Sequence, residues 1–367
     1  MHFTISMKKK EGCSQSISSI TWRKFRKNRL GMASLIFISS LMLLSILGYL
    51  VTPDHTPYCN DQILEIRLLK PGSGMDFLTI KKNEPFEKKG WFHTMLFGKP
   101  NPYLIIPVSS YSFEKDSVRV NVFREAEPYN LKCFARKEVS GIKHRTFILG
   151  TDRYGRDLLS QLVIGARISL SIGFVSVCIA LLIGVLLGAA AGYFGGKTDN
   201  VILWFINVVW SVPSLLLVIA ISFVLGSGFW QVFIAIGLTM WVDIARVVRG
   251  QFISLREMEY VEASKALGFK SFTIMFRHIL PNMTGTLTVI SASNFASAIL
   301  TEAGLSFLGI GVQPPMPSWG NMIKENYGYI ILDYAYLAIV PGIAIVMLVL
   351  AFMLLGNALR DATDINN

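Results

Sequence analysis

Residues 259–282 read EYVEASKALGFKSFTIMFRHILPN, a polar and basic stretch between two long apolar segments. Good helix formers run from Glu259 to Leu267, and apolar residues recur along one side at Tyr260, Ala263 and Leu267. Gly268 stands where this helix is expected to end, because a residue without a Cβ atom easily adopts the left-handed cap conformation. The stretch therefore predicts a first short helix that stops at Gly268.

A second short helix is predicted after this glycine. Its apolar residues follow the i, i+3, i+4, i+7 spacing of one helix face, at Phe272, Met275, Phe276 and Ile279. Leu280 and Pro281 end this helix. Pro281 has no N–H, which suits the first turn of the next helix because an N–H there would have no partner within the helix. A hairpin of this kind is expected at a membrane surface, where a protein in the aqueous phase can bind it.

The composition indicates a membrane protein. Of the 367 residues, 52% are hydrophobic and 16% are charged, whereas about 25% are charged in an ordinary soluble domain. The net charge of +11 suggests nucleic acid at first sight. Basic residues also flank membrane spans on the cytoplasmic side, however, and the apolar fraction favours that interpretation over nucleic-acid binding.

About six stretches have the roughly 20 apolar residues that a helix needs to cross a bilayer. They are residues 31–51, 168–194, 201–225, 229–248, 283–309 and 336–359. The first has a long basic leader and no small-residue cleavage site after it, so it is expected to remain as an anchor and not to be removed as a signal peptide. The chain is thus predicted to be an all-α membrane protein outside one inserted segment.

Lysine and arginine predict the orientation. Many precede the first span, at Lys8, Lys9, Lys10, Arg23, Lys24, Arg26, Lys27 and Arg29. The hairpin region is also basic, whereas the connection at 310–335 holds only Lys324. Both termini and the hairpin are therefore expected in the cytoplasm, and alternation through the spans gives the same answer.

Residues 53–148 differ from the rest in being rich in proline and in charges of both signs. Alternating valines predict a half-buried strand at 117–124, and 62–69 and 77–82 are weaker strand candidates. We expect a mostly β extracytoplasmic insert between the first and second spans, with a long disordered loop as the alternative. Cys59 and Cys133 fall here, and a disulfide or two free thiols are both possible outside the membrane.

No catalytic, cofactor or metal site is predicted. Gly196-Lys197-Thr198 resembles the end of a phosphate-binding loop, but Ala191 occupies the position of the required first glycine. All five histidines lie outside the predicted spans, which leaves an intramembrane enzyme without a base or metal ligand there. An ion channel would need a filter loop or rings of charge, and it would leave the hairpin unexplained.

The hairpin resembles the cytoplasmic coupling loop of ABC-importer permeases. That pattern is Glu-Ala-Ala, three residues, Gly, nine residues, Ile, one residue, Leu-Pro. Serine replaces the second alanine here and histidine replaces the isoleucine, so that the matching residues are Glu262, Ala263, Ser264, Gly268, His278, Leu280 and Pro281.

Other stretches resemble the dipeptide, oligopeptide and nickel permeases, and among their paired subunits the C-type. They are LGTDRYGRDLLSQLVIGARISLSIG (149–173), AGYFGGKTDN (191–200), LTEAGLSFLGIGVQPPMPSWGNMI (300–323) and LLGNALRDATD (354–364). The expected organisation is a basic cytoplasmic segment 1–30, a first transmembrane helix 31–52, the insert 53–148, and a permease domain 149–367 with the coupling loop 259–281.

The resemblance implies a subunit of a type I ABC importer in the bacterial cytoplasmic (inner) membrane. Such a permease is surrounded by lipid and pairs with a second, homologous permease to form the translocation path. Two ATPase subunits hydrolyse ATP below, and an extracytoplasmic solute-binding protein delivers a peptide or a related small solute such as nickel. The coupling loop would pass the motion of the ATPases to the spans.

Polar residues within the spans are candidates for the translocation path, namely Asn207, Asn294 and Glu302. Glu302 could equally pair inside the protein and fix helix packing. Arg246 and Arg249 are interpreted as cytoplasmic anchors of the fourth span. Just before the second span, Asp152, Arg153, Arg156 and Asp157 fit either contact with the binding protein or a structural salt-bridge turn.

Overall fold

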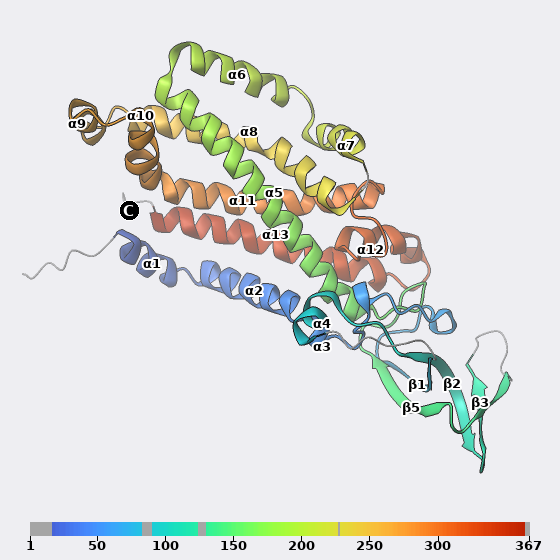
Figure 1. Cartoon of the computed structure of the whole chain (residues 1–367). Helices are drawn as coiled ribbons and strands as arrows, with labels where there is room; N and C mark the ends of the chain where they lie inside the picture. Colours follow the sequence, from blue (N-terminus) through green and yellow to red (C-terminus); the bar gives the residue numbers. More distant parts are fainter. Residues whose placement is uncertain (1–16, 83–89, 124–129, 227, 364–367) are drawn as a thin grey trace, which may run out of the picture.

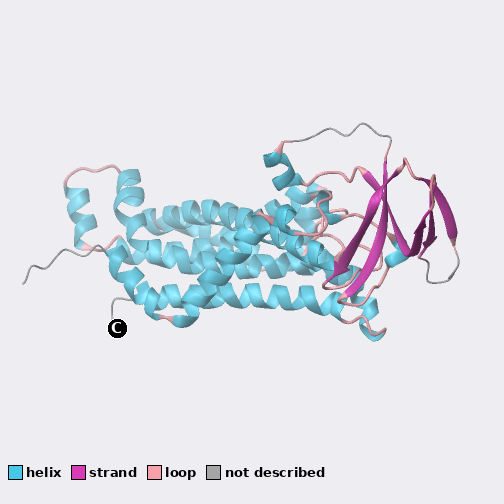
Figure 2. Ribbon diagram, turned by 90° about the horizontal axis from the view of Figure 1, so that it is seen from below, coloured by secondary structure: helices cyan, strands magenta, loops and turns pink. Residues whose placement is uncertain are grey.

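The computed structural model describes residues 17–82, 90–123, 130–226 and 228–363. Long helices run side by side in an elongated bundle, and a five-stranded sheet stands at one end of it (Figure 1). Figure 2 shows the same separation of helices and strands from below. The expected fold class, a helical membrane protein with a β insert between the first two spans, is confirmed.

Five helices of the described residues are long and apolar enough to cross a membrane, and one bent pair raises the number to six. They are α2 (Arg29–Ile46), α5 (Leu158–Phe194), α8 (Phe229–Leu255), α11 (Thr284–Leu308, which continues an apolar stretch from Ser271) and α13 (Tyr336–Thr363). The helix α5 starts ten residues before the predicted span, because the Asp157 carboxylate caps it by accepting from the N–H of Ser160 (2.9 Å).

The predicted span at 201–225 is a bent pair of helices. The chain forms α6 (Gly196–Trp210) and α7 (Ser214–Leu225), which meet at an angle of 90°. Pro213 explains the break, because it has no N–H to donate into the helix and disfavours a helical conformation at Val212 before it. Pro341, in contrast, lies inside α13 without ending it.

Small residues bring α5 and α8 into close contact. A Cβ atom at Gly184 would lie 2.8 Å from the carbonyl oxygen of Trp241, and one at Gly188 would lie 2.8 Å from the Cβ of Val248. Gly192, one turn further, faces α8 in the same way. Glycines four residues apart form a flat surface on which a second helix backbone can rest, as in many membrane proteins.

The insert holds an antiparallel sheet of order β4-β3-β2-β1-β5. Its strands are β1 (Ser73–Lys81), β2 (Tyr103–Phe113), β3 (Ser117–Val122), β4 (Leu131–Ala135) and β5 (Val139–Phe147), with the short helix α4 (Trp91–Phe97) between β1 and β2. The strands predicted near 77–82 and 117–124 are thus present. The candidate strand at 62–69 is wrong, because it forms a single 3-10 turn (Leu64–Ile66) that buries Ile66 beneath the sheet.

The chain leaves the bundle to form the sheet and returns to the bundle at a neighbouring position. The N–H of Gly72 donates to the carbonyl oxygen of Phe147 (2.8 Å), so the two ends of the sheet lie side by side. Residues just before Gly72 belong with the bundle, since Tyr336 on α13 donates its hydroxyl to the carbonyl of Leu69 (2.9 Å). Cys59 is buried and Cys133 is exposed, and both are free thiols.

The two ends of the bundle carry different elements. The helix α1 (Ile17–Lys27), the last turns of α13 and the short helices α9 (Glu259–Ala266) and α10 (Ser271–Thr273) lie at one end (Figure 1). The sheet, the short helix α3 (Gly48–Val51) and α12 (Trp319–Asn326) lie toward the other. The hairpin that begins at α9 is therefore on the opposite side of the bundle from the sheet.

Candidate functional site

The first arm of the hairpin ends as its sequence predicts. Gly268 has φ of +79°, its N–H donates to the carbonyl of Lys265 (3.0 Å), and the N–H of Phe269 donates to that of Ser264 (3.2 Å). These two bonds form a Schellman cap, which satisfies the last carbonyls of α9 and turns the chain sharply. The left-handed conformation expected at Gly268 is confirmed.

The second arm is one nearly continuous helix that changes its hydrogen bonding before Pro281. After α10, residues Ile274–Ile279 form a π-helical turn, and Leu280–Met283 form a 3-10 turn that leads directly into α11. The N–H of Leu280 donates to the carbonyl of Met275, five residues back. Pro281 stands in the first turn of the segment that follows, as predicted.

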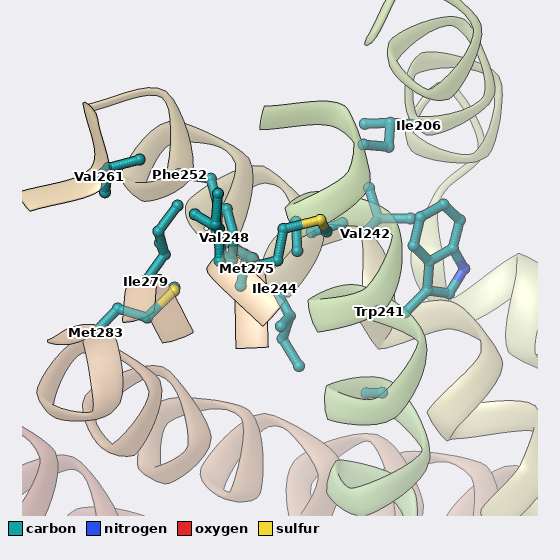
Figure 3. Close-up of a cluster of buried hydrophobic side chains, with 14 residues drawn as sticks. Ile206, Trp241, Val242, Ile244, Val248, Phe252, Val261, Met275, Ile279 and Met283 are labelled. Carbon is teal, nitrogen blue, oxygen red and sulfur yellow. The ribbon is translucent and has the colours of Figure 1, made fainter. Parts of the chain in front are cut away.

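The hairpin is anchored to the bundle by buried apolar side chains. Val261 from the first arm and Met275 and Ile279 from the second lie against Val248 and Phe252 of α8 (Figure 3). Met283 and Ile274 belong to the same buried cluster. Since the side chains of both arms interdigitate with those of α8, the hairpin is expected to move with α8 and α11 as one body.

The opposite side of the hairpin is apolar and exposed. Leu267 has 77% of its surface accessible and Phe272 has 71%, and Met258, Tyr260 and Phe269 are exposed beside them. The apolar stripe of Tyr260, Ala263 and Leu267 that the sequence predicts lies on this exposed side. Val261 and Ser264 are buried on the other side of α9, where Val261 joins the cluster that includes Val248 and Phe252 of α8.

The structure distributes the residues of the coupling pattern over both sides of the hairpin. Glu262, Ala263 and Pro281 are exposed. Ser264 is buried, and its hydroxyl donates to the carbonyl of Tyr260 (2.8 Å), so serine takes the place of alanine without an unpaired polar group. Gly268 is exposed as well, whereas His278 and Leu280 are half-buried, with the His278 ring 5.5 Å from that of Phe269.

The three candidates for the translocation path are not joined to one another by any described hydrogen bond. Asn207 on α6 is exposed and accepts from Arg246 (3.2 Å). Asn294 on α11 is buried and donates to the carbonyl of Ile290 in its own helix (2.9 Å). Their positions in a path remain predictions.

Glu302 is fully buried at the contact of three helices. Its carboxylate accepts from the hydroxyl of Ser306 on α11 (2.7 Å) and from that of Ser169 on α5 (3.4 Å). Ser318, which caps α12, donates its hydroxyl to Ser306 (3.3 Å). This geometry matches the alternative in which Glu302 pairs inside the protein and fixes helix packing.

Two arginines form ion pairs that join elements of the bundle. Arg249 on α8 binds Asp199 at the start of α6 through two nitrogens (2.5 and 2.7 Å). Arg156 is buried between Asp152 (2.6 Å) and Glu325 on α12 (2.5 Å). The structural salt-bridge turn proposed for 152–157 is thus present, but Glu325 was missed because it lies 169 residues from Arg156 and no local pattern points to it.

The five or six spans of the described residues define a multi-pass membrane protein, and its hairpin is anchored to the bundle by buried side chains. Residues 184–364 match the family model of the binding-protein-dependent transport system inner membrane component. Residues 16–71 match the N-terminal TM domain of oligopeptide transport permease C.

Curated relatives agree with these matches. The glutathione transport system permease protein GsiD of Pectobacterium atrosepticum is 41% identical over 59% of this chain and 71% of its own length. The oligopeptide transport system permease protein OppC of Bacillus subtilis is 40% identical over 59% of this chain and 70% of its own length. The dipeptide transport system permease protein DppC of Lactococcus lactis is 30% identical over 94% of this chain and 89% of its own length.

The chain belongs to the family of binding-protein-dependent transport permeases. It is a permease subunit of an ABC importer, and such subunits are transport proteins and not enzymes. A permease of this family works with an ATPase and a binding protein.

Proposed function

We propose that this chain forms half of the translocation path for short peptides and takes up the motion of its ATPase partners through the loop 259–281. The observation that carries the proposal is the two-sided hairpin, with Val261 and Ile279 buried against the bundle and Leu267 and Phe272 exposed. A rigid lever needs one face fixed to the moving helices and another free for its socket.

The exposed face has the composition of a protein-binding surface. Large apolar side chains at its centre are flanked by charges of both signs from Glu259, Glu262, Lys265 and Lys270. An interface of this kind places aromatic and aliphatic residues in pockets of the partner and leaves charges at the rim. We infer that each of two ATPase subunits receives one such hairpin, one from this chain and one from a second, homologous permease.

Peptides are the proposed cargo because the relatives bear the names of dipeptide, oligopeptide and glutathione permeases. The basic residues before α2 and around the hairpin support a cytoplasmic position for both termini and the loop, in a bacterial inner membrane. An extracytoplasmic binding protein would then deliver the peptide on the side of the sheet.

The proposal is tested with the assembled transporter in proteoliposomes. Leu267→Asp combined with Phe272→Asp is expected to lower peptide-stimulated ATPase activity at least about tenfold, since a buried charge in an interface centre costs more than ~1.4 kcal/mol. The matched control is Leu131→Asp, an exposed leucine on β4 at the other end of the molecule, which is expected to keep full stimulation.

Uptake of a radiolabelled dipeptide, compared with uptake of nickel, tests the cargo separately. Full stimulation in the hairpin variant would overturn the coupling role. Nickel uptake without dipeptide uptake would overturn the peptide assignment and leave the coupling role intact.

A further inference from the structure

The short helix α4 in the insert presents an apolar surface. Its sequence is WFHTMLF, and of its large apolar side chains Met95 alone is buried. Trp91 is 62% accessible and Phe92 is 69% accessible, and Leu96 and Phe97 are exposed as well. A helix of a water-soluble β domain would turn such residues inward, so this surface is expected to have a partner.

One arginine determines where this surface lies. Arg167 on α5 donates to the carbonyls of Ser45 (2.8 Å) and Ile46 (2.7 Å) at the end of α2, and to those of Leu96 (2.6 Å) and Met95 (3.2 Å) at the end of α4. A single guanidinium therefore joins the C-terminal ends of α2 and α4. Figure 1 shows α4 next to α3, at the point where α2 ends.

The end of α2 marks a membrane boundary. This helix has 18 residues, which at 1.5 Å per residue span about 27 Å, close to the ~30 Å of the hydrocarbon layer. Its N-terminal end is basic and its surface is largely unburied by the rest of the chain. Since Arg167 joins the two helix ends, α4 lies at the depth of the membrane surface on the sheet side.

The apolar surface of α4 is continuous with the lipid-facing surface of the first span. Leu43 and Ile46 at the end of α2 are exposed, and so are Leu50 and Val51 of α3, which packs against α4. The bilayer that covers α2 therefore reaches α4 without an intervening polar element. Tryptophan and other aromatic residues are the side chains that prefer this interfacial depth.

We propose that α4 is an interfacial helix that lies in the membrane surface on the sheet side, with Trp91, Phe92, Leu96 and Phe97 inserted among lipid chains. Helices of this type bury one apolar face at the boundary of headgroups and acyl chains. The insert is then held against the bilayer by lipid contact, in addition to its bond network with the bundle. The occupant of the surface is lipid, not a second protein.

The test is a depth measurement by electron paramagnetic resonance on the full chain in liposomes. Native Cys13, Cys59, Cys133 and Cys178 are replaced by alanine, and a nitroxide is attached at Phe92→Cys or, in a second variant, at Leu96→Cys. Both labels are expected to relax faster with oxygen, which concentrates in lipid, than with a water-soluble nickel chelate.

The matched control is Phe113→Cys on β2, an aromatic residue with 53% exposure at the strand end paired with β3. Its label is expected to respond to the nickel chelate and little to oxygen. The proposal is overturned if the labels at positions 92 and 96 behave like the control. It is also overturned if neither reagent reaches them, because another protein surface would then cover the helix.

Discussion

At Gly268 the backbone adopts φ of +79°, and a Cβ atom placed there would meet no other atom within 4 Å. The cost of a side chain therefore lies in the backbone conformation, about 1–2 kcal/mol for an ordinary residue and more for a β-branched one. Gly268→Val is expected to weaken the Schellman cap and to lower peptide-stimulated ATPase activity several-fold in proteoliposomes with the partner subunits.

Asparagine tolerates the left-handed region well. Gly268→Asn is therefore the control and is expected to keep most of the stimulation, while both variants insert into the membrane to the same extent. Equal activity of the valine variant and the natural chain would mean that the cap does not set the angle of the hairpin.

Among the helices, the contact of α5 with α8 depends on glycines that admit no side chain. A Cβ atom at Gly188 would lie 2.5 Å from the carbonyl oxygen of Ala245. Gly188→Ala is expected to destabilise the fold by roughly 1–3 kcal/mol through overpacking, measured as a lower Tm in detergent.

Gly250 on α8 is the matched control, because a Cβ atom there would meet nothing within 4 Å. Gly250→Ala is expected to leave Tm unchanged or to raise it slightly, since alanine favours a helix by about 1 kcal/mol over glycine. A similar drop in both variants would show that the α5–α8 contact is not the cause.

For helices and turns, the sequence predicts those features that depend on neighbouring residues alone. The cap at Gly268, the entry of Pro281 into the next helix and the apolar spans all follow from residue type and spacing. The direction in which α9 faces does not, because Tyr260 and Val261 are both apolar and only the position of α8 decides which is buried. The Arg156–Glu325 ion pair could not be predicted from the sequence for the same reason, since it depends on where α12 lies in the folded protein.

Considered as a whole, the molecule places its sheet and its hairpin at opposite ends (Figure 1). Residues 73–146 can be replaced by a short glycine-serine linker, because Gly72 and Phe147 already form a hydrogen bond of 2.8 Å. The shortened chain is expected to retain its ATPase partners in co-purification, with somewhat lower thermal stability since Arg167 loses two of its carbonyl partners.

The comparison for this deletion is the full chain with Leu267→Asp and Phe272→Asp, which is expected to lose the ATPase partners instead. If the shortened chain also failed to co-purify with the ATPases, binding of the ATPases at the hairpin would depend on the sheet despite their separation.

The adjacency of Gly72 and Phe147 also has an evolutionary consequence. Because the sheet begins and ends at neighbouring residues, it can be gained, lost or exchanged in evolution without changing the path of the chain through the helices. The same junction offers a place where a fluorescent or affinity module could be grafted without redesigning the transmembrane core.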